Sequence, residues 1–419
     1  MGRITFIVGF GVLIQLFSFN GFGQINSAIS SKHSNIHTVY LAPKEENYII
    51  KQNPVISIEK QDNWFIHFDD LDPNYKNYFL RIVHCNKDFI PSPLNEIEYL
   101  SEFNDLPVRN YEQSNGTKVP YKHFEIPLPK ASLSGNYVAI LYSNRNKQDT
   151  VFAVRYSLVN IQANIFSKIS FTNQNAYRKS HQSFQLTFNY SNQLIINDES
   201  NLKVKVRKVN SNSFENLKLD QPIHNVQDRT VTYQFFGQEG IVPGGNEYRM
   251  IDLRSSQQRL SYVGDLNQQG NITQITTFPE NAQGNYPYVQ RNDINGGYLI
   301  ANYENPQNIL YADYVNCIFK LKASPRSNTP IYLSGGFTNF IKNDLLKMDY
   351  DSGTGYYEIK LLLKQGIYNY KFVSEEQETN DYLEGNHAQT ENEYEVLIYF
   401  QQPGTRYDSL IGYQPVRFP

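Results

Sequence analysis

Cysteine and net positive charge are both scarce in this sequence, and each shortage argues against a class of protein. Only two cysteines are present, Cys85 and Cys317, and they lie far apart in the chain. We expect them in different domains, as buried free thiols rather than as parts of a disulfide framework. The formal net charge is −3, which provides no general attraction to phosphate and argues against nucleic acid as a partner.

Long hydrophobic runs are also absent beyond the N-terminus, where none approaches the roughly 20 residues that a membrane-spanning helix needs. At the N-terminus, Arg3 precedes an apolar stretch over residues 4–19, and Gly21 and Gly23 have the spacing that signal peptidase accepts. We therefore predict a secretory signal peptide over residues 1–23, and a mature chain without a transmembrane segment. The alternative, an N-terminal membrane anchor, is disfavoured because the stretch is short.

The motifs of common catalytic and cofactor sites are missing as well. The sequence has no Gly-rich phosphate loop, no Gly-x-Ser-x-Gly, no His-Glu-x-x-His and no paired-cysteine signature, so we predict a protein that is not an enzyme and has no cofactor. His84 and Cys85 are adjacent, but successive side chains of a strand point to opposite faces, so we interpret them as an edge histidine and a core thiol. Asp69 and Asp70 precede a turn and could hold calcium, although turn formation explains them better.

Tyrosine and phenylalanine are abundant instead, with 32 and 26 residues respectively, and this composition is typical of β-strands. Apolar and polar residues alternate in a series of segments that Gly, Asn, Asp and Pro separate, which is the pattern of antiparallel sandwiches. Only residues 94–103 indicate a helical turn. We therefore predict an all-β fold of tandem immunoglobulin-like antiparallel β-sandwich domains. The predicted strands are residues 64–68, 78–83, 137–142, 152–156, 184–190, 202–206, 230–236, 315–321, 356–362, 368–373 and 394–400.

One predicted strand has a basic face, formed by Lys203, Lys205 and Arg207. We interpret it as a solvated face of a sheet, because surface strands often carry charge on their outer side. A surface that binds an acidic partner is the alternative.

The length of the chain predicts several hydrophobic cores. A first sandwich is expected over residues 24–158 and a second over 159–310, with a long hairpin or loop insert rich in Gln, Asn, Gly and Tyr. A last sandwich is expected over 311–400, and a polar tail follows over 401–419. We expect this tail to be an arm that packs on another surface.

The segment predicted as the last sandwich is similar to early-set immunoglobulin-like modules, including glycogen-binding modules. The similarity lies in PIYLSGGFTNF (330–340), MDYD (348–351), GYY (355–357) and QGIYNYKF (365–372). Those modules stack sugar rings on tryptophans. Here Phe340 stands where such modules often carry one of them, and the second has no counterpart.

A resemblance over nearly the whole mature chain is more specific, because eight segments occur in the order found in one family. This family is that of the type IX secretion system plug proteins. Phe89 departs from the family pattern, which commonly has Trp there, and the change keeps an aromatic filler. The eight segments are HFDDLDPNY (67–75), YFLRIVHCNKDF (78–89), EYLSEF (98–103), YKHFEIPLP (121–129), SGNYVAILY (134–142), PGGNEYRMIDLRS (243–255), LKQGIYNYKFV (363–373) and EGNHAQTENEYEVLIYF (384–400).

The resemblance implies a periplasmic protein, associated with the outer membrane through its partner, that binds the translocon β-barrel of the type IX secretion system. It would occlude the periplasmic opening of this barrel when no cargo is being released, as a monomer within a hetero-complex. Two loops of the shared segments are the candidate contacts with the barrel, although both could instead serve internal turns and strand ends. The candidate residues are Gly244, Gly245, Asn246, Glu247, Tyr248 and Arg249 in the first loop, and Asn386, His387, Thr390, Glu391 and Asn392 in the second.

Two other functions stay open at this point. One is a periplasmic or surface glycan-binding protein, which the last predicted sandwich suggests. The other is an enzyme with two catalytic carboxylates in a cleft between sandwiches, an arrangement that sequence alone does not reveal.

Overall fold

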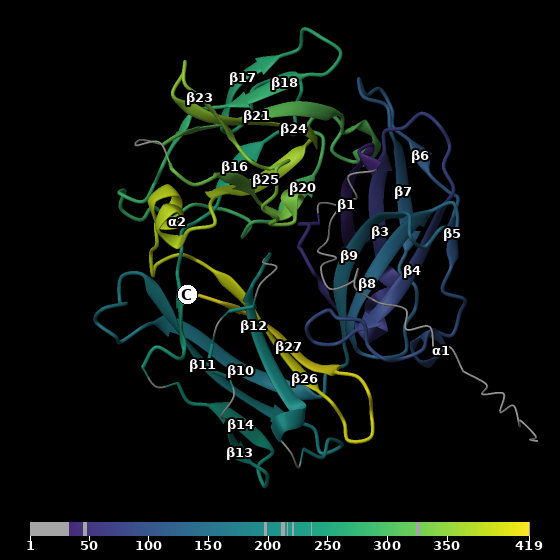
Figure 1. Ribbon diagram of the computed structural model, residues 1–419, viewed down its shortest axis with the longest axis vertical. Helices are drawn as coiled ribbons and strands as arrows, with labels where there is room; N and C mark the ends of the chain where they lie inside the picture. Colours follow the sequence, from purple (N-terminus) through teal and green to yellow (C-terminus); the bar gives the residue numbers. More distant parts are fainter. Residues whose placement is uncertain are drawn as a thin grey trace, which may run out of the picture.

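Three β-sandwiches make up the part of the chain that the computed structural model describes. It describes residues 33–418 except 45–47, 197–198, 211–213, 216, 220–221, 236 and 324–326, so the predicted signal peptide lies outside the described residues. In Figure 1 the first sandwich lies on the right, the second at the lower left and the third at the upper left. The predicted all-β class is confirmed. Within the described ranges, no helix is both long and apolar enough to span a membrane.

The first sandwich packs two sheets, with the strand orders β2-β9-β8-β4-β5 and β1-β3-β7-β6. Their inward side chains form one buried cluster, in which the rings of Phe68 and Phe124 stack 4.5 Å apart. Helix α1 (Glu96–Tyr99) confirms the predicted helical turn. The strands are β1 (Ile36–Pro43), β2 (Val55–Ser57), β3 (Trp64–Asp70), β4 (Tyr78–Cys85), β5 (Leu106–Val108), β6 (Glu112–Gln113), β7 (Lys122–Pro127), β8 (Gly135–Ser143) and β9 (Thr150–Val159), and the 3₁₀ helix η2 (Ile58–Asn63) precedes β3.

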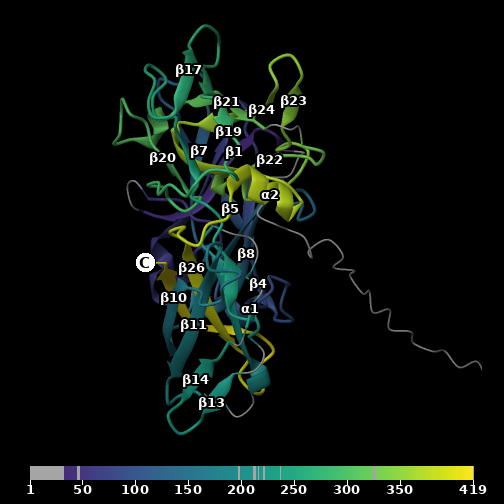
Figure 2. The same cartoon turned by 90° about the vertical axis from the view of Figure 1, so that its left-hand side faces the viewer.

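The second sandwich combines a sheet of the order β10-β11-β14-β13, to which β15 adds through β11, with the sheet β12-β26-β27. Its buried cluster joins Phe188 of one sheet to Val396 of the other. In Figure 2, β13 and β14 of this sandwich lie at the lower end of the molecule. The strands are β10 (Ala163–Phe171), β11 (His181–Tyr190), β12 (Leu202–Lys208), β13 (Ile223–Asn225), β14 (Thr230–Tyr233), β15 (Ile241–Pro243), β26 (Glu393–Phe400) and β27 (Ser409–Arg417), and η3 (Glu199–Asn201) leads into β12.

The third sandwich packs β16-β25-β20, with β22 also on β25, against β17-β18-β21-β24-β23, with β19 on β21. Phe319 and Tyr370 meet in its core with ring centroids 4.9 Å apart. The sequence analysis missed its helix α2 (Gln377–Glu384), which follows the last strand. The strands are β16 (Arg249–Asp252), β17 (Val263–Asn267), β18 (Gln274–Thr277), β19 (Glu280–Asn281), β20 (Tyr298–Ile300), β21 (Tyr314–Lys322), β22 (Tyr332–Ser334), β23 (Asp349–Asp351), β24 (Tyr356–Lys364) and β25 (Gly366–Val373), with η4 (Ile309–Tyr311) and η5 (Gly336–Thr338) between them.

The predicted domain boundaries at residues 310 and 400 need correction, because the third sandwich is inserted into the second. Strand β26 pairs with the whole of β12 from Tyr394 to Phe400, and β27, in the predicted polar tail, pairs with β26. All eight residues of β26 are buried. One face of the strand joins the core of the second sandwich, and Leu397 and Tyr399 on the other face pack on Val159 of the first sandwich. The alternation of apolar and polar residues within β12 and within β26 predicts that each is a strand. It does not predict which strand each one pairs with.

The basic strand β12 lies at the boundary with the first sandwich, which corrects the expectation of a fully solvated face. Arg207 is 3% exposed and its Nε lies 2.7 Å from a carboxylate oxygen of Glu395. Lys205 forms an ion pair of 3.1 Å with Asp88 of the first sandwich. Only Lys203 is largely exposed.

The segment between β1 and β2 touches all three sandwiches. Ile50 forms a backbone bridge with Tyr298 of the third sandwich. The backbone of Gln52 donates to Asn210, which follows β12, and its side chain donates to the carbonyl of Gly336, both at 2.8 Å. These contacts hold the three sandwiches together as one unit.

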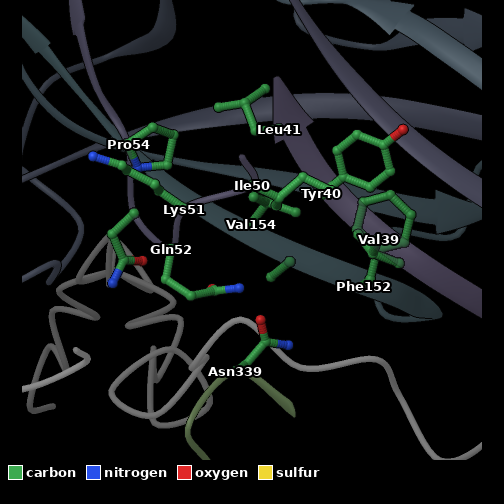
Figure 3. A pocket seen from close by; sticks show the side chains of 12 residues that line it. Val39, Tyr40, Leu41, Ile50, Lys51, Gln52, Pro54, Phe152, Val154 and Asn339 are labelled. Carbon is green, nitrogen blue, oxygen red and sulfur yellow. The ribbon is translucent and has the colours of Figure 1, made fainter. Parts of the chain in front are cut away.

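A cavity of only about 20 Å³ remains where these parts meet. Figure 3 shows Phe152 of the first sandwich, Ile50 of the connecting segment and Asn339 of the third sandwich around it. This volume holds about one water molecule, so this cavity has no room for a larger ligand.

A buried ion pair joins the first and third sandwiches. The carboxylate of Asp69 accepts hydrogen bonds from His123 at 2.6 Å, and from Lys364 and Tyr314 at 2.7 Å each. Burial alone would raise the pKa of Asp69, but Lys364 and His123 outweigh burial and hold the pKa at about 2. The predicted turn role is therefore wrong for Asp69, whose oxygens are occupied by donors rather than free for calcium. It is confirmed for Asp70, whose Oδ1 accepts from the backbone N–H of Asp72 at 2.9 Å.

Two buried histidines make stability depend on pH. Burial lowers the pKa of His67 from 6.5 to about 3 and that of His84 from 6.5 to about 4. Because the folded pKa lies below the unfolded one, the unfolded chain binds more protons between these values. The free energy of unfolding should therefore fall as the pH drops from about 6.5 towards 4, by up to about 1.4 kcal/mol per pH unit for each histidine.

Urea denaturation at several pH values between 7 and 4.5 measures this slope. The variant His67→Gln should show a smaller slope than the parent, because one of the two titrating groups is removed. Equal slopes for the variant and the parent would show that His67 does not contribute to the pH dependence of stability.

Candidate partner-binding site

The two predicted contact loops lie side by side, at the place where the chain crosses between the second and third sandwiches. One crossing segment runs from β15 to β16 and the other from α2 to β26. His387 donates its backbone N–H to the carbonyl of Gly245 at 2.7 Å, and Asn386 accepts from the N–H of Gly245 at 2.9 Å. Asn392 donates to the carbonyl of Gly244 at 2.7 Å. The structure therefore brings together residues that are far apart in the sequence.

The two glycines of the first crossing segment serve different purposes. Gly245 has a φ of 73°, in the left-handed region that favours glycine. Gly244 is needed for space, since a Cβ there would lie 2.0 Å from the carbonyl oxygen of His387. The close approach of the two segments depends on this missing side chain.

The variant Gly244→Ala should separate the crossing segments and destabilise the protein by about 2 kcal/mol or more, because backbone atoms cannot move away as a flexible side chain would. Gly353→Ala is the matched control, since Gly353 lies in an exposed turn and a Cβ there would meet only Asp351 Oδ1, at 3.3 Å. Urea denaturation compares the two variants. Equal, small losses of stability in both variants would contradict a tight contact between Gly244 and the carbonyl oxygen of His387.

A buried arginine anchors the crossing from the side of the third sandwich. The Nε of Arg249 lies 3.1 Å from Glu384 at the end of α2, and its Nη1 lies 2.6 Å from Glu280. Burial alone would lower the pKa of Arg249, but Glu384 and Glu280 raise it. This charged group fixes the end of α2, and so the start of the second crossing segment, on β16.

Most of the eleven predicted contact residues are therefore inside the protein. Buried members are Gly244, Asn246, Glu247, Arg249, Thr390 and Asn392. Four others, Gly245, Tyr248, Asn386 and His387, are half-buried, and Glu391 is exposed. The internal role that the sequence left open is thus visible for most of them, and contact of the exposed members with a partner stays a prediction.

The other residues that the sequence analysis considered for chemistry, His84 and the two cysteines, are buried side chains. Burial raises the pKa of the Cys85 thiol to about 12, which leaves it protonated and unreactive. His84 is 1% exposed, which corrects the expected edge position, and its Nδ1 lies 2.9 Å from Ser92 Oγ. Cys85 and Cys317 are both buried free cysteines in different sandwiches, as predicted. Among the described residues, no group of three His, Cys, Asp or Glu side chains is arranged to hold a metal.

Two larger cavities lie beside these elements. One cavity, of about 460 Å³, lies between the first and third sandwiches. Its lining includes His67, His123 and Ile309. The other, of about 340 Å³, lies next to the crossing, where Asn246 and Arg249 meet the loop that follows β19. Gln283 and Arg291 of this loop also line the second cavity, and the sequence analysis missed them because the polar composition of the loop indicated only a connector.

Comparisons with known proteins agree with this fold. Residues 36–160 match the family described as the type 9 secretion system plug protein 1st domain, and this segment coincides with the first sandwich. The whole fold is similar to the crystal structure of a hypothetical protein from Parabacteroides merdae ATCC 43184, with a TM-score of 0.83 and 27% identity over 94% of this chain and 99% of that chain. No curated protein matches the sequence. Residues 36–160 thus match the first domain of type 9 secretion system plug proteins, the family that the sequence resembles.

Proposed function

We propose that this protein is a periplasmic plug of the type IX secretion system, which binds the periplasmic opening of the outer-membrane translocon barrel. It closes the opening when no cargo is being released and so prevents leakage. The role is occlusion by shape, and no catalytic step is involved. The observation that carries the proposal is the match of residues 36–160 to the first domain of plug proteins.

The way the sandwiches are joined supports this role. A stopper for a wide pore must resist deformation, and here each pair of sandwiches is joined by buried contacts. The Asp69 and Lys364 ion pair joins the first and third sandwiches, while Leu397 and Tyr399 pack the second on the first. The two crossing segments join the second and third sandwiches. Such a body moves as one piece and can block an opening without internal rearrangement.

We further propose that the partner is contacted by the outer side of the crossing, through the half-buried Tyr248 and His387 and the exposed Glu391. Tyrosine suits such a surface, because it contributes a large contact area with few rotatable bonds and its hydroxyl tolerates water. The protein acts as a monomer within a hetero-complex and is held at the outer membrane through the barrel.

A deletion strain tests the proposed plugging. Loss of the chain should make the envelope permeable to a large antibiotic that the outer membrane normally excludes. A strain that lacks both this chain and the translocon barrel is the control, and its envelope should be tight again because no open pore is left. Unchanged permeability in the single deletion, or equal leakage in both strains, would overturn the proposal.

A further inference from the structure

The cavity between the first and third sandwiches, of about 460 Å³, has a histidine with an unused nitrogen in its wall. This histidine, His67, is 7% exposed, and its ring stacks on Tyr40 with the centroids 4.6 Å apart. Its Nδ1 lies 3.4 Å from Nε2 of His123. Its Nε2 has no hydrogen-bond partner among the residues that the structure describes and is not sealed inside the protein, so it opens on the cavity.

The hydrogen bonds around His67 assign this nitrogen as an acceptor. The carboxylate of Asp69 can only accept, so the Nδ1 of His123, at 2.6 Å, carries a proton. Lys364 already supplies the positive charge beside Asp69, at 2.7 Å, so His123 is neutral and its Nε2 accepts from the Nδ1–H of His67. Burial lowers the pKa of His67 to about 3, which keeps this ring neutral as well. Since a neutral imidazole has one donor and one acceptor, Nε2 of His67 presents a lone pair to the cavity.

Two glutamates lie beside His67 on the same face of the sheet. Glu125 of β7 lies directly opposite His67 of β3, and Glu112 of β6 lies directly opposite His123 of β7. Both glutamates line the cavity. Such diagonal neighbours on adjacent strands are about 7–8 Å apart. Their carboxylates therefore repel each other across the position that Nε2 of His67 faces.

The charges at this wall do not balance. Among the described lining residues, Lys44 supplies the only ammonium group, and its Nζ lies 5.8 Å from the ring centroid of Phe65. Neither Glu112 nor Glu125 forms an ion pair within the described part of the chain. Two carboxylates and one ammonium group leave an excess of one negative charge. The cavity therefore offers acceptors and negative charge to a ligand.

The opposite wall of the cavity is apolar. It consists of Leu299 and Ile300 at β20, and of Pro306, Ile309 and Leu310 at η4 and just before it. A cavity of this volume with an apolar lining and a few converging polar groups has the properties of a small-ligand site.

We propose that this cavity binds a primary ammonium group on an apolar chain, as found in a lysine side chain of a peptide or in a small alkylamine. An ammonium group has three N–H donors. One donates to Nε2 of His67 and the others to the carboxylates of Glu112 and Glu125, in charge-assisted hydrogen bonds. The methylene chain lies along the apolar wall. A guanidinium group, whose five donors have a fixed planar geometry, matches these three acceptors less well. Binding of an amine here is independent of the proposed plugging.

Isothermal titration calorimetry on the full chain tests the proposal with two matched pairs of probes. Hexylamine is compared with 1-hexanol, and a capped peptide with lysine between apolar residues is compared with its norleucine counterpart. The amine that binds should bind about tenfold or more tightly than its neutral partner, since hydrogen bonds to charged groups are the strong ones. A preference for hexylamine alone assigns the site to small amines, and a preference for the lysine peptide assigns it to a peptide side chain. Equal binding within both pairs would overturn the proposal.

Three variants and a control assign the binding to this cavity. Glu125→Gln, at an exposed position, should lose most of the preference for the amine. Gln307→Lys, exposed and in the lining, adds an ammonium group of the chain itself and should weaken binding by repulsion. His67→Phe keeps a ring that stacks on Tyr40 but removes the acceptor, so it should also weaken binding.

Glu102→Gln is the matched control, because Glu102 is an exposed glutamate of the same sandwich that lies outside the cavity lining. Circular dichroism confirms that each variant is folded, and the two substitutions at exposed positions decide the result if His67→Phe does not fold. Unchanged amine binding in the folded variants, or an equal loss in the control, would overturn the proposal.

Discussion

Replacing Lys364 by methionine is expected to lower the free energy of unfolding by about 3–5 kcal/mol, because it leaves a buried carboxylate without its cation. Asp69 and Lys364 are each 1% exposed at their side chains and lie 2.7 Å apart. The hydrogen bonds from His123 and Tyr314 remain in the variant, but neither group carries a permanent positive charge. Since the pair joins two sandwiches, the loss should appear as a weaker contact between them.

Urea denaturation followed by circular dichroism measures the effect. Lys130→Met is the matched control, because Lys130 and Asp62 form an ion pair of 2.8 Å with side chains 67% and 64% exposed. Such a surface pair is worth about 0–1 kcal/mol. Similar small losses for the two variants would contradict the importance of the buried pair.

Replacing Arg249 by methionine is expected to have an effect of similar size, about 3–5 kcal/mol, because Glu384 would stay buried without a cation. Arg249 is 1% exposed at its side chain and Glu384 is 7% exposed. The Oε1 of Glu384 also accepts the backbone N–H of Phe372 at 2.8 Å. The carboxylate therefore cannot turn to solvent without loss of this bond, and the end of α2 should detach.

A double variant separates the charge from the packing. Adding Glu384→Gln to Arg249→Met removes the unpaired charge and should restore part of the lost stability. Arg417→Met is the control, since Arg417 is 78% exposed and lies 3.6 Å from Glu393. If the double variant is no more stable than Arg249→Met alone, the unpaired charge of Glu384 is not the cause of the lost stability.

The strands could be predicted from the sequence because the alternation of apolar and polar residues is visible within each short segment. Each predicted strand overlaps an observed one within the described residues, as β4 and β21 illustrate. The pairing of strands could not be predicted, since the same alternation fits many partners. Strand β26 follows the third sandwich in the sequence but pairs with β12, almost 200 residues earlier. Helix α2 was missed because it is short and lies between strands.

The candidate site could be predicted only in part. The two predicted contact loops meet at the crossing, and their contact with a partner stays a prediction. Their burial could not be predicted, because it depends on contacts such as that between Gly244 and His387. Ion pairs between sandwiches, such as Asp69 with Lys364, join residues 295 positions apart and have no local signal. The same holds for the convergence of Arg249 and Arg291 at the cavity beside the crossing.

Affinity purification of the tagged full chain from its native envelope, in mild detergent and followed by mass spectrometry, tests the proposed function most directly. The plug assignment predicts that a very large outer-membrane β-barrel is recovered in near-equal amount. Recovery of polysaccharide-uptake components instead, or of nothing above background, would contradict it and favour glycan binding.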